Sequence, residues 1–257
     1  MDAAVLAALI TAVASLVVAG GNAAVSAMNR RRTEALAHEL THLQATLDRE
    51  ARQEEREISA RAELDRAREP LLSAALDLAH RLDNIRREYF LDAYMSHGNG
   101  HRAEIATSST LYRFGRYWCT VEALYDRVVL LQFLADEATR PVAGTRRDVG
   151  RTFASDEYDS GRFMMWREEQ RAIAELMRSE DTDRGCIGYA TFVERYDDTF
   201  SRWFGSFKQD LEPSAARSSE RFDALQYKLA VLASQLDLQQ TYKDQWERLM
   251  RGATREP

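Results

Sequence analysis

The chain has 257 residues, of which 45% are hydrophobic and 30% are charged, so it is too apolar for a wholly disordered protein. Its 35 basic and 41 acidic residues leave a formal net charge of −6, which argues against a strongly basic nucleic-acid binder, and we expect no nucleic-acid partner. Its 4 prolines and 12 glycines are too few for the many turns of a β-sandwich or barrel, and its 2 cysteines are too few for a disulfide scaffold.

The first segment, residues 3–28, contains no charged side chain. As a helix it would be about 39 Å long, enough to cross a bilayer core of about 30 Å. Residues 1–29 are therefore predicted to be a transmembrane anchor, with the lipid bilayer as a partner. A cleaved signal peptide and a buried or interfacial helix are the alternatives; the first is disfavoured because no basic side chain precedes the apolar run.

Three arginines, Arg30, Arg31 and Arg32, follow the apolar segment directly. The positive-inside bias predicts that they stay in the cytoplasm, where they would contact anionic headgroups. The chain is then a single-pass protein of the cell membrane, with its N-terminus outside and its C-terminal domain in the cytoplasm. Reduced Cys119 and Cys186 fit that compartment.

Residues 30–69 contain neither glycine nor proline and are rich in alanine, glutamate, arginine and leucine. A leucine seam with spacings of 4, 3 and 4 runs along this segment, as in a coiled coil. The seam comprises Leu36, Leu40, Leu43 and Leu47. So narrow a stripe is marginal for a helix alone, so we expect it to pair with a second copy or with its own C-terminal domain.

The sequence His38-Glu39-Leu40-Thr41-His42 within this segment resembles the H-E-x-x-H signature of zinc metallopeptidases. On a helix, His38 and His42 share a face and would bind zinc, with Glu39 as the general base. No suitable third ligand follows, because Glu63 would lie about 31 Å from His42 along an unbroken helix. We therefore expect no metal and no cofactor, and keep a membrane-tethered zinc metallopeptidase as an alternative.

Pro70 is predicted to break the long helix and to begin a C-terminal helical bundle over residues 70–252, followed by a frayed tail at 253–257. Apolar residues at helical spacing mark the elements of this bundle. The predicted helices cover approximately 70–94, 104–135, 146–153, 166–177, 189–211 and 222–236. The fold class is therefore all-α, with a transmembrane helix, a juxtamembrane coiled-coil helix and a bundle.

A cluster of charges in the bundle gives the candidate ligand-binding residues. They are Arg113, Arg116, Glu122, Arg167 and Arg171. Such side chains would form a buried ion-pair network or line a pocket for an anionic ligand such as a nucleotide or a lipid headgroup. Ordinary surface pairing between neighbouring helical turns is the competing interpretation, and we find no sequence signature that fixes catalytic residues.

Four segments are similar to those of a family of bacterial membrane-anchored helical proteins. These segments are PLLSAALDLAHRLDNI, TLYRFGRYWCTVEALY, WREEQRAIAELM and CIGYATFVERY. The resemblance implies an N-terminal anchor, a coiled-coil stretch and a helical bundle, but no activity.

The combined prediction is a single-pass membrane-anchored protein without catalytic activity that acts as a scaffold, a signalling module or a binder of a protein partner. A ligand sensor or membrane-acting effector is a further alternative. A predominantly basic pocket in the bundle would favour the sensor.

Overall fold

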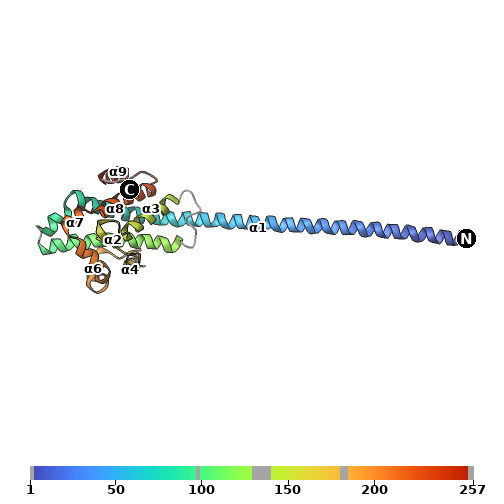
Figure 1. Ribbon diagram of the computed structural model, residues 1–257, viewed down its shortest axis with the longest axis horizontal. Helices are drawn as coiled ribbons and strands as arrows, with labels where there is room; N and C mark the ends of the chain where they lie inside the picture. The colour runs from blue at the N-terminus through green and yellow to red at the C-terminus, as the bar shows by residue number, and fades with distance from the viewer. Residues whose placement is uncertain (1–2, 97–98, 129–139, 180–184, 254–257) are drawn as a thin grey trace. The chain divides into compact units, whose positions relative to one another are not determined.

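The computed structural model describes the backbone of residues 3–96, 99–128, 140–179 and 185–253, and it describes side chains from residue 39 onward, except at 57, 60, 61, 63, 64, 67 and 125–128 within these ranges. The described residues are helical and form no β-strand, which confirms the all-α prediction (Figure 1). The α-helices are α1 (Ala3–Arg87), α2 (Gly100–Val128), α3 (Arg140–Ala154), α4 (Arg167–Met177), α5 (Tyr189–Glu194), α6 (Ser201–Asp210), α7 (Pro213–Arg217), α8 (Glu220–Leu236) and α9 (Lys243–Gly252). Shorter turns are η1 (Asp92–Ser96), η3 (Asp159–Gly161) and η4 (Tyr196–Phe200).

The chain divides into two compact units, Met1–Glu55 and Arg56–Pro257. Helix α1 contains Pro70 in its interior, so the break predicted at this residue does not occur. A proline inside a helix costs about 3 kcal/mol, because one backbone hydrogen bond is lost and the ring meets the preceding turn. The leucines that follow Pro70 are buried, and this burial offsets the cost.

The C-terminal part of α1 belongs to the core of the second unit. Its buried stripe consists of Leu71, Leu72, Ala75, Leu78, Ala79, Leu82 and Ile85. Polar contacts fix the same stretch to helix α8, since Gln226 Nε2 donates to Asp83 Oδ1 at 3.0 Å and Arg86 donates to Gln226 Oε1 at 2.8 Å. The end of α1 is therefore held by both apolar and polar contacts.

Aromatic side chains from several helices meet around Phe114 of α2. The ring centroids of Phe207 and Phe153 lie 4.7 and 5.8 Å from that of Phe114, in edge-to-face geometry. The Trp118 ring stacks on Phe204 at 5.9 Å. Aromatic residues at helical spacing within the helix predicted at 189–211, such as Phe204 and Phe207, therefore lie in the core, as expected for an amphipathic helix.

Arg221 of α8 is fully buried and closes the C-terminal end of α3. Its guanidinium donates to the carbonyls of Thr152 at 2.5 Å and Ser155 at 2.7 Å, and its Nε donates to Arg162 O at 3.0 Å. The last carbonyls of a helix have no intrahelical donor, so a buried arginine satisfies them. Desolvation lowers the pKa of Arg221, and the charge of Asp159 opposes that shift.

Several predicted elements differ in their bounds. The helix expected to reach residue 94 ends at Arg87, close to Tyr89, which has a positive φ of 58°. The helix expected over 189–211 is interrupted by the π-helical turn η4, and α9 forms beyond the last predicted helix. Helix α4 matches the prediction within one residue. Side-chain periodicity predicts which residues are buried better than it predicts where a helix ends.

No helix is long and apolar enough to cross a membrane within the residues that the structure describes. The side chains of the predicted anchor at 1–29, of the cluster Arg30–Arg32 and of the first seam leucine, Leu36, precede residue 39 and lie outside the described side chains. The anchor therefore stays a prediction from the sequence.

Candidate functional site

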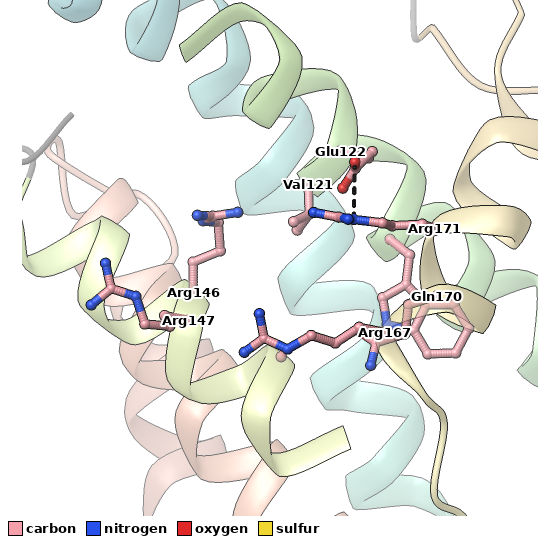
Figure 2. Close-up of a pocket in the computed structure, with 9 residues that line it drawn as sticks. Val121, Glu122, Arg146, Arg147, Arg167, Gln170 and Arg171 are labelled. Carbon is pink, nitrogen blue, oxygen red and sulfur yellow. Dashed lines mark ion pairs between the residues drawn. The ribbon is translucent and has the colours of Figure 1, made fainter. Parts of the chain in front are cut away.

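A pocket of about 270 Å³ lies between α2, α3 and α4 (Figure 2). We call it the arginine pocket. Its lining residues are Trp118, Val121, Glu122, Arg146, Arg147, Gly150, Arg167, Gln170 and Arg171. Four guanidinium groups and one carboxylate thus surround a space of the size of a small ligand.

The local sequence explains why each helix contributes to this pocket. Helix α2 contributes positions 118, 121 and 122, and helix α4 contributes positions 167, 170 and 171. Positions i, i+3 and i+4 lie on one face of a helix, so both triplets point the same way. Residues on the other sides of these helices, such as Ile173 of α4 and Thr120 of α2, are buried in the core. The pocket face of each helix is therefore fixed by the packing of its other face.

The charges of the pocket are unequal. Arg171 Nε lies 3.6 Å from Glu122 Oε1, the ion pair drawn in Figure 2. The side chains of Arg147 and Arg167 form neither a hydrogen bond nor an ion pair with any residue that the structure describes. With one carboxylate for four guanidinium groups, the pocket has an excess of positive charge.

Figure 2 shows how these side chains are directed. Arg146, Arg167 and Arg171 extend toward a common space, whereas Arg147 extends away from it at the rim. Arginine has five N–H donors and no acceptor, and it binds carboxylates and phosphates through paired hydrogen bonds. Three inward guanidinium groups therefore favour an anion with several oxygen acceptors.

Two aromatic residues of α2 lie beside this group of charges. The indole Nε1 of Trp118 is buried and has no hydrogen-bond partner among the described residues, so one N–H donor of the lining residues is unused. Burial raises the pKa of the neighbouring Tyr117 phenol, and the positive charge of Arg146 opposes this shift. The electrostatic effect of Arg146 thus reaches the phenol of Tyr117 on the buried side of α2.

The structure brings together three of the five predicted ligand-binding residues. Glu122, Arg167 and Arg171 line the arginine pocket. Arg116 instead donates to Asp77 Oδ2 at 2.5 Å and to Ser73 Oγ at 2.9 Å on α1. Arg113 donates to the Ser109 carbonyl at 3.0 Å within α2. Arg116 thus joins α2 to α1, Arg113 binds within its own helix, and neither arginine lines the pocket.

Sequence reasoning missed Arg146 and Arg147. The adjacent arginines 146 and 147 form a local signal, since they begin the short helix predicted at 146–153. Nothing in the sequence shows that this helix lines the same pocket as residues 167–171.

A second cavity, of about 290 Å³, lies between α2 and the α5–η4–α6 segment. Its cation, Lys208, lies 4.7 Å from the ring centroid of Tyr196. The lining also includes Glu104 and Asp197, so positive charge is not concentrated there. Charge rather than volume distinguishes the arginine pocket.

The H-E-x-x-H segment lies on α1 in the first unit. Glu39 and His42 are exposed, and the side chain of His38 lies outside the described residues. No group of three histidine, cysteine, aspartate or glutamate side chains that could hold a metal ion occurs in the part of the chain that the structure describes. The zinc alternative therefore stays a prediction.

Comparison with protein families, with curated proteins and with solved structures finds no match to this chain. The described residues define an all-helical protein with an arginine-lined pocket.

Proposed function

We propose that the helical bundle is a ligand-binding module and that the arginine pocket binds a phosphate-bearing anion. The observation that carries this proposal is the convergence of Arg146, Arg167 and Arg171 on one small space with a single carboxylate, Glu122. This selects the ligand-sensor alternative and assigns no catalytic step to the bundle.

The chemistry of the lining favours phosphate over a neutral ligand. The guanidinium groups and the Trp118 N–H are hydrogen-bond donors, whereas the Gln170 amide already donates to Met165 O at 2.8 Å. Glu122 is the only carboxylate among the lining residues that the structure describes. An ionised phosphate group offers several acceptor oxygens to these donors. The volume of about 270 Å³ suits a pyrophosphate group or the phosphorylated end of a larger molecule.

Calorimetric titration of the full chain in detergent tests this proposal. We expect saturable binding of inorganic pyrophosphate and ADP, weakened about tenfold by Arg167→Gln or Arg171→Gln, because each removes a charge-assisted hydrogen bond. Arg151→Gln is the matched control, since Arg151 is an exposed arginine of α3 outside the pocket. An absence of binding, or equal weakening in the control, would contradict the proposal.

A third titrant shows whether the bound phosphate belongs to a lipid headgroup or to a soluble molecule. Short-chain phosphatidic acid presents the same phosphate on a lipid. Binding of the lipid but not of pyrophosphate or ADP would place the ligand in the membrane, whereas the reverse result would identify a soluble ligand.

The proposal includes the predicted anchor, with the bundle on the cytoplasmic side. Its support is the uncharged run at 3–28, followed directly by three arginines. Leu9→Arg with Leu16→Arg should release the protein from membranes in alkaline carbonate, because a charge at the centre of a span costs about 3 kcal/mol. The matched change at Leu238, an exposed residue of the bundle, should not release it.

Self-association through α1 is the second part of the proposal, and one observation favours it. Leu40, Leu43 and Leu47 are 64%, 60% and 55% exposed. Their spacing of 3 and 4 is that of a coiled-coil seam, for which a second copy of the chain supplies a matching surface. Sedimentation velocity of the full chain in detergent, compared with Leu43→Glu, tests whether the seam joins two copies.

A further inference from the structure

The two cysteines of the chain meet in the bundle. Cys119 lies on α2, and Cys186 follows α4, 67 residues later. Their sulfur atoms are 2.7 Å apart, which is longer than a disulfide bond of about 2.05 Å but closer than an ordinary contact between two sulfurs. Both residues are buried, and no disulfide bond joins them.

The backbone around each cysteine is fixed. Cys119 is in the interior of α2. Cys186 forms an isolated antiparallel bridge with Arg178, and on either side of it Ser179 N donates to Gly185 O at 3.1 Å and Ile187 N donates to Met177 O at 2.8 Å. The two sulfurs are therefore held together by hydrogen-bonded structure.

The two thiols differ in acidity. The hydrogen bond that Cys186 shares with Cys119 lowers the pKa of Cys186, and contacts with Thr120, Arg116 and Arg178 lower it further, while burial opposes the shift. The same shared hydrogen bond, together with burial, raises the pKa of Cys119. Cys186 is also the more accessible of the two, with 7% exposure against 0%. The thiolate is the reactive form of cysteine, so Cys186 is the expected nucleophile.

We propose that Cys119 and Cys186 are an oxidation site, at which hydrogen peroxide converts the two adjacent thiols into an intramolecular disulfide. This inference is independent of ligand binding in the arginine pocket. Peroxide is the oxidant because it is small enough to reach a sulfur that is almost completely buried.

The chemistry takes two steps. The Cys186 thiolate attacks one peroxide oxygen, the O–O bond breaks, hydroxide leaves, and a sulfenic acid forms on Cys186. The Cys119 sulfur then attacks the Cys186 sulfur, the S–O bond breaks, and the leaving hydroxide takes the Cys119 proton to give a second water. Overall, two thiols lose two electrons and two protons, and one peroxide molecule becomes two water molecules.

The closed disulfide would join Cys119 of α2 to Cys186, which lies between α4 and α5, and it would close a loop of 67 residues. A cross-link of this span restricts the unfolded chain, so the oxidised protein should unfold at a higher temperature than the reduced protein. Thermal unfolding with and without a reductant measures this difference. An equal or lower unfolding temperature would mean that the disulfide strains the native contacts.

Thiol counting on the full chain tests the site itself. Reduced protein is exposed to increasing hydrogen peroxide, quenched, denatured and labelled with a maleimide before intact-mass measurement. We expect uptake to fall from two labels to none, without a lasting one-label species, and a thiol reductant to restore both labels. Retention of both thiols, a stable one-label product, or a disulfide between two chains on a non-reducing gel would overturn the proposal.

Single variants test the order of the two steps. Cys119→Ala should leave Cys186 as a sulfenic acid that dimedone captures, because the resolving thiol is missing. Cys186→Ala should leave Cys119 uncaptured, because that thiol is buried and protonated. The reverse pattern would contradict the assigned roles, and circular dichroism shows whether each variant is folded. The thiol count on the unsubstituted protein tests the site without either variant.

Discussion

Helix α1 carries leucines in two different environments. At Leu40, Leu43 and Leu47 more than half of each side chain is exposed, whereas Leu71, Leu78 and Leu82 are fully buried. The stripe that contains Leu43 has only one or two apolar residues per helical turn. The stripe that contains Leu78 is wider, because alanines and an isoleucine lie beside its leucines. A wide stripe matches the surface of a globular bundle, while a narrow one matches a second helix. The width of an apolar stripe thus indicates what covers it.

The buried part of the molecule should be far more sensitive to substitution than the exposed part, and the largest effect is expected at Arg221, the buried arginine of the bundle. Arg221→Met should lower the free energy of unfolding by about 4 kcal/mol, because it leaves several buried carbonyls without donors. Urea unfolding followed by tryptophan fluorescence reports on the bundle alone, since the 4 tryptophans are at 118, 166, 203 and 246. Arg195→Met, at an exposed position, should change stability by less than about 0.5 kcal/mol.

The leucines themselves give the direct test. Leu78→Ala should cost about 3 kcal/mol in the same measurement, because it creates a cavity in the core. Leu43→Ala should leave this transition within about 0.5 kcal/mol, since Leu43 is 60% exposed. Similar losses for both variants would show that the narrow stripe is also part of the folded core.

The close approach of two helices in the bundle provides a smaller effect. A Cβ atom on Gly115 of α2 would lie 3.3 Å from Ile173 Cγ2 and from Met177 Sδ of α4. Gly115→Val should therefore cost about 2 kcal/mol by overpacking. A Cβ on Gly205 meets no atom within 4 Å, so Gly205→Ala should stabilise the bundle by about 0.5 kcal/mol. Equal effects of the two substitutions would show that α2 and α4 are not tightly packed.

The smallest expected effect is pH dependence at Tyr196. Burial, followed by the charge of Asp197, raises the pKa of its phenol from 10.0 to about 12. The stability contributed by the neutral phenol is present below pH 10 and is lost as pH rises toward 12, by about 1 kcal/mol at pH 11. In Tyr196→Phe this part of the loss should disappear, measured as the difference between the two unfolding curves at pH 9 and 11. Parallel curves would show that Tyr196 is solvated.

The helices of the bundle were predictable from spacing, but their meeting points were not. Phe114 and Phe207 follow helical periods within their own segments, which identified them as core residues. Arg167 and Arg146 belong to different helices, and no local pattern records that these helices are neighbours. The same reason hides the contact between Cys119 and Cys186, because a separation of 67 residues carries no periodic signal.

The predicted ligand-binding residues that do not line the pocket were misplaced for the same reason, because contacts between helices leave no local pattern. Arg113, Arg116 and Glu122 occupy one helix, and the sequence predicted a shared role for them. The rotation of α2 directs Glu122 to the pocket and Arg116 to Asp77 of α1. That rotation is fixed by the packing of Phe114 and Trp118 in three dimensions. Spacing alone places Arg116 and Glu122 on different sides of α2, but it does not show which neighbour each side meets.

The polar contacts between α1 and α8 can form only late in the synthesis of the chain. Arg86 finds Gln226 only after 140 further residues have been added. At about 5–20 residues per second, a ribosome takes on the order of ten seconds to deliver that partner. During this interval the Arg86 guanidinium lies in a partly folded bundle without its partner on α8. Slowing translation between the codons for these two residues should therefore increase proteolysis or chaperone capture of the incomplete chain.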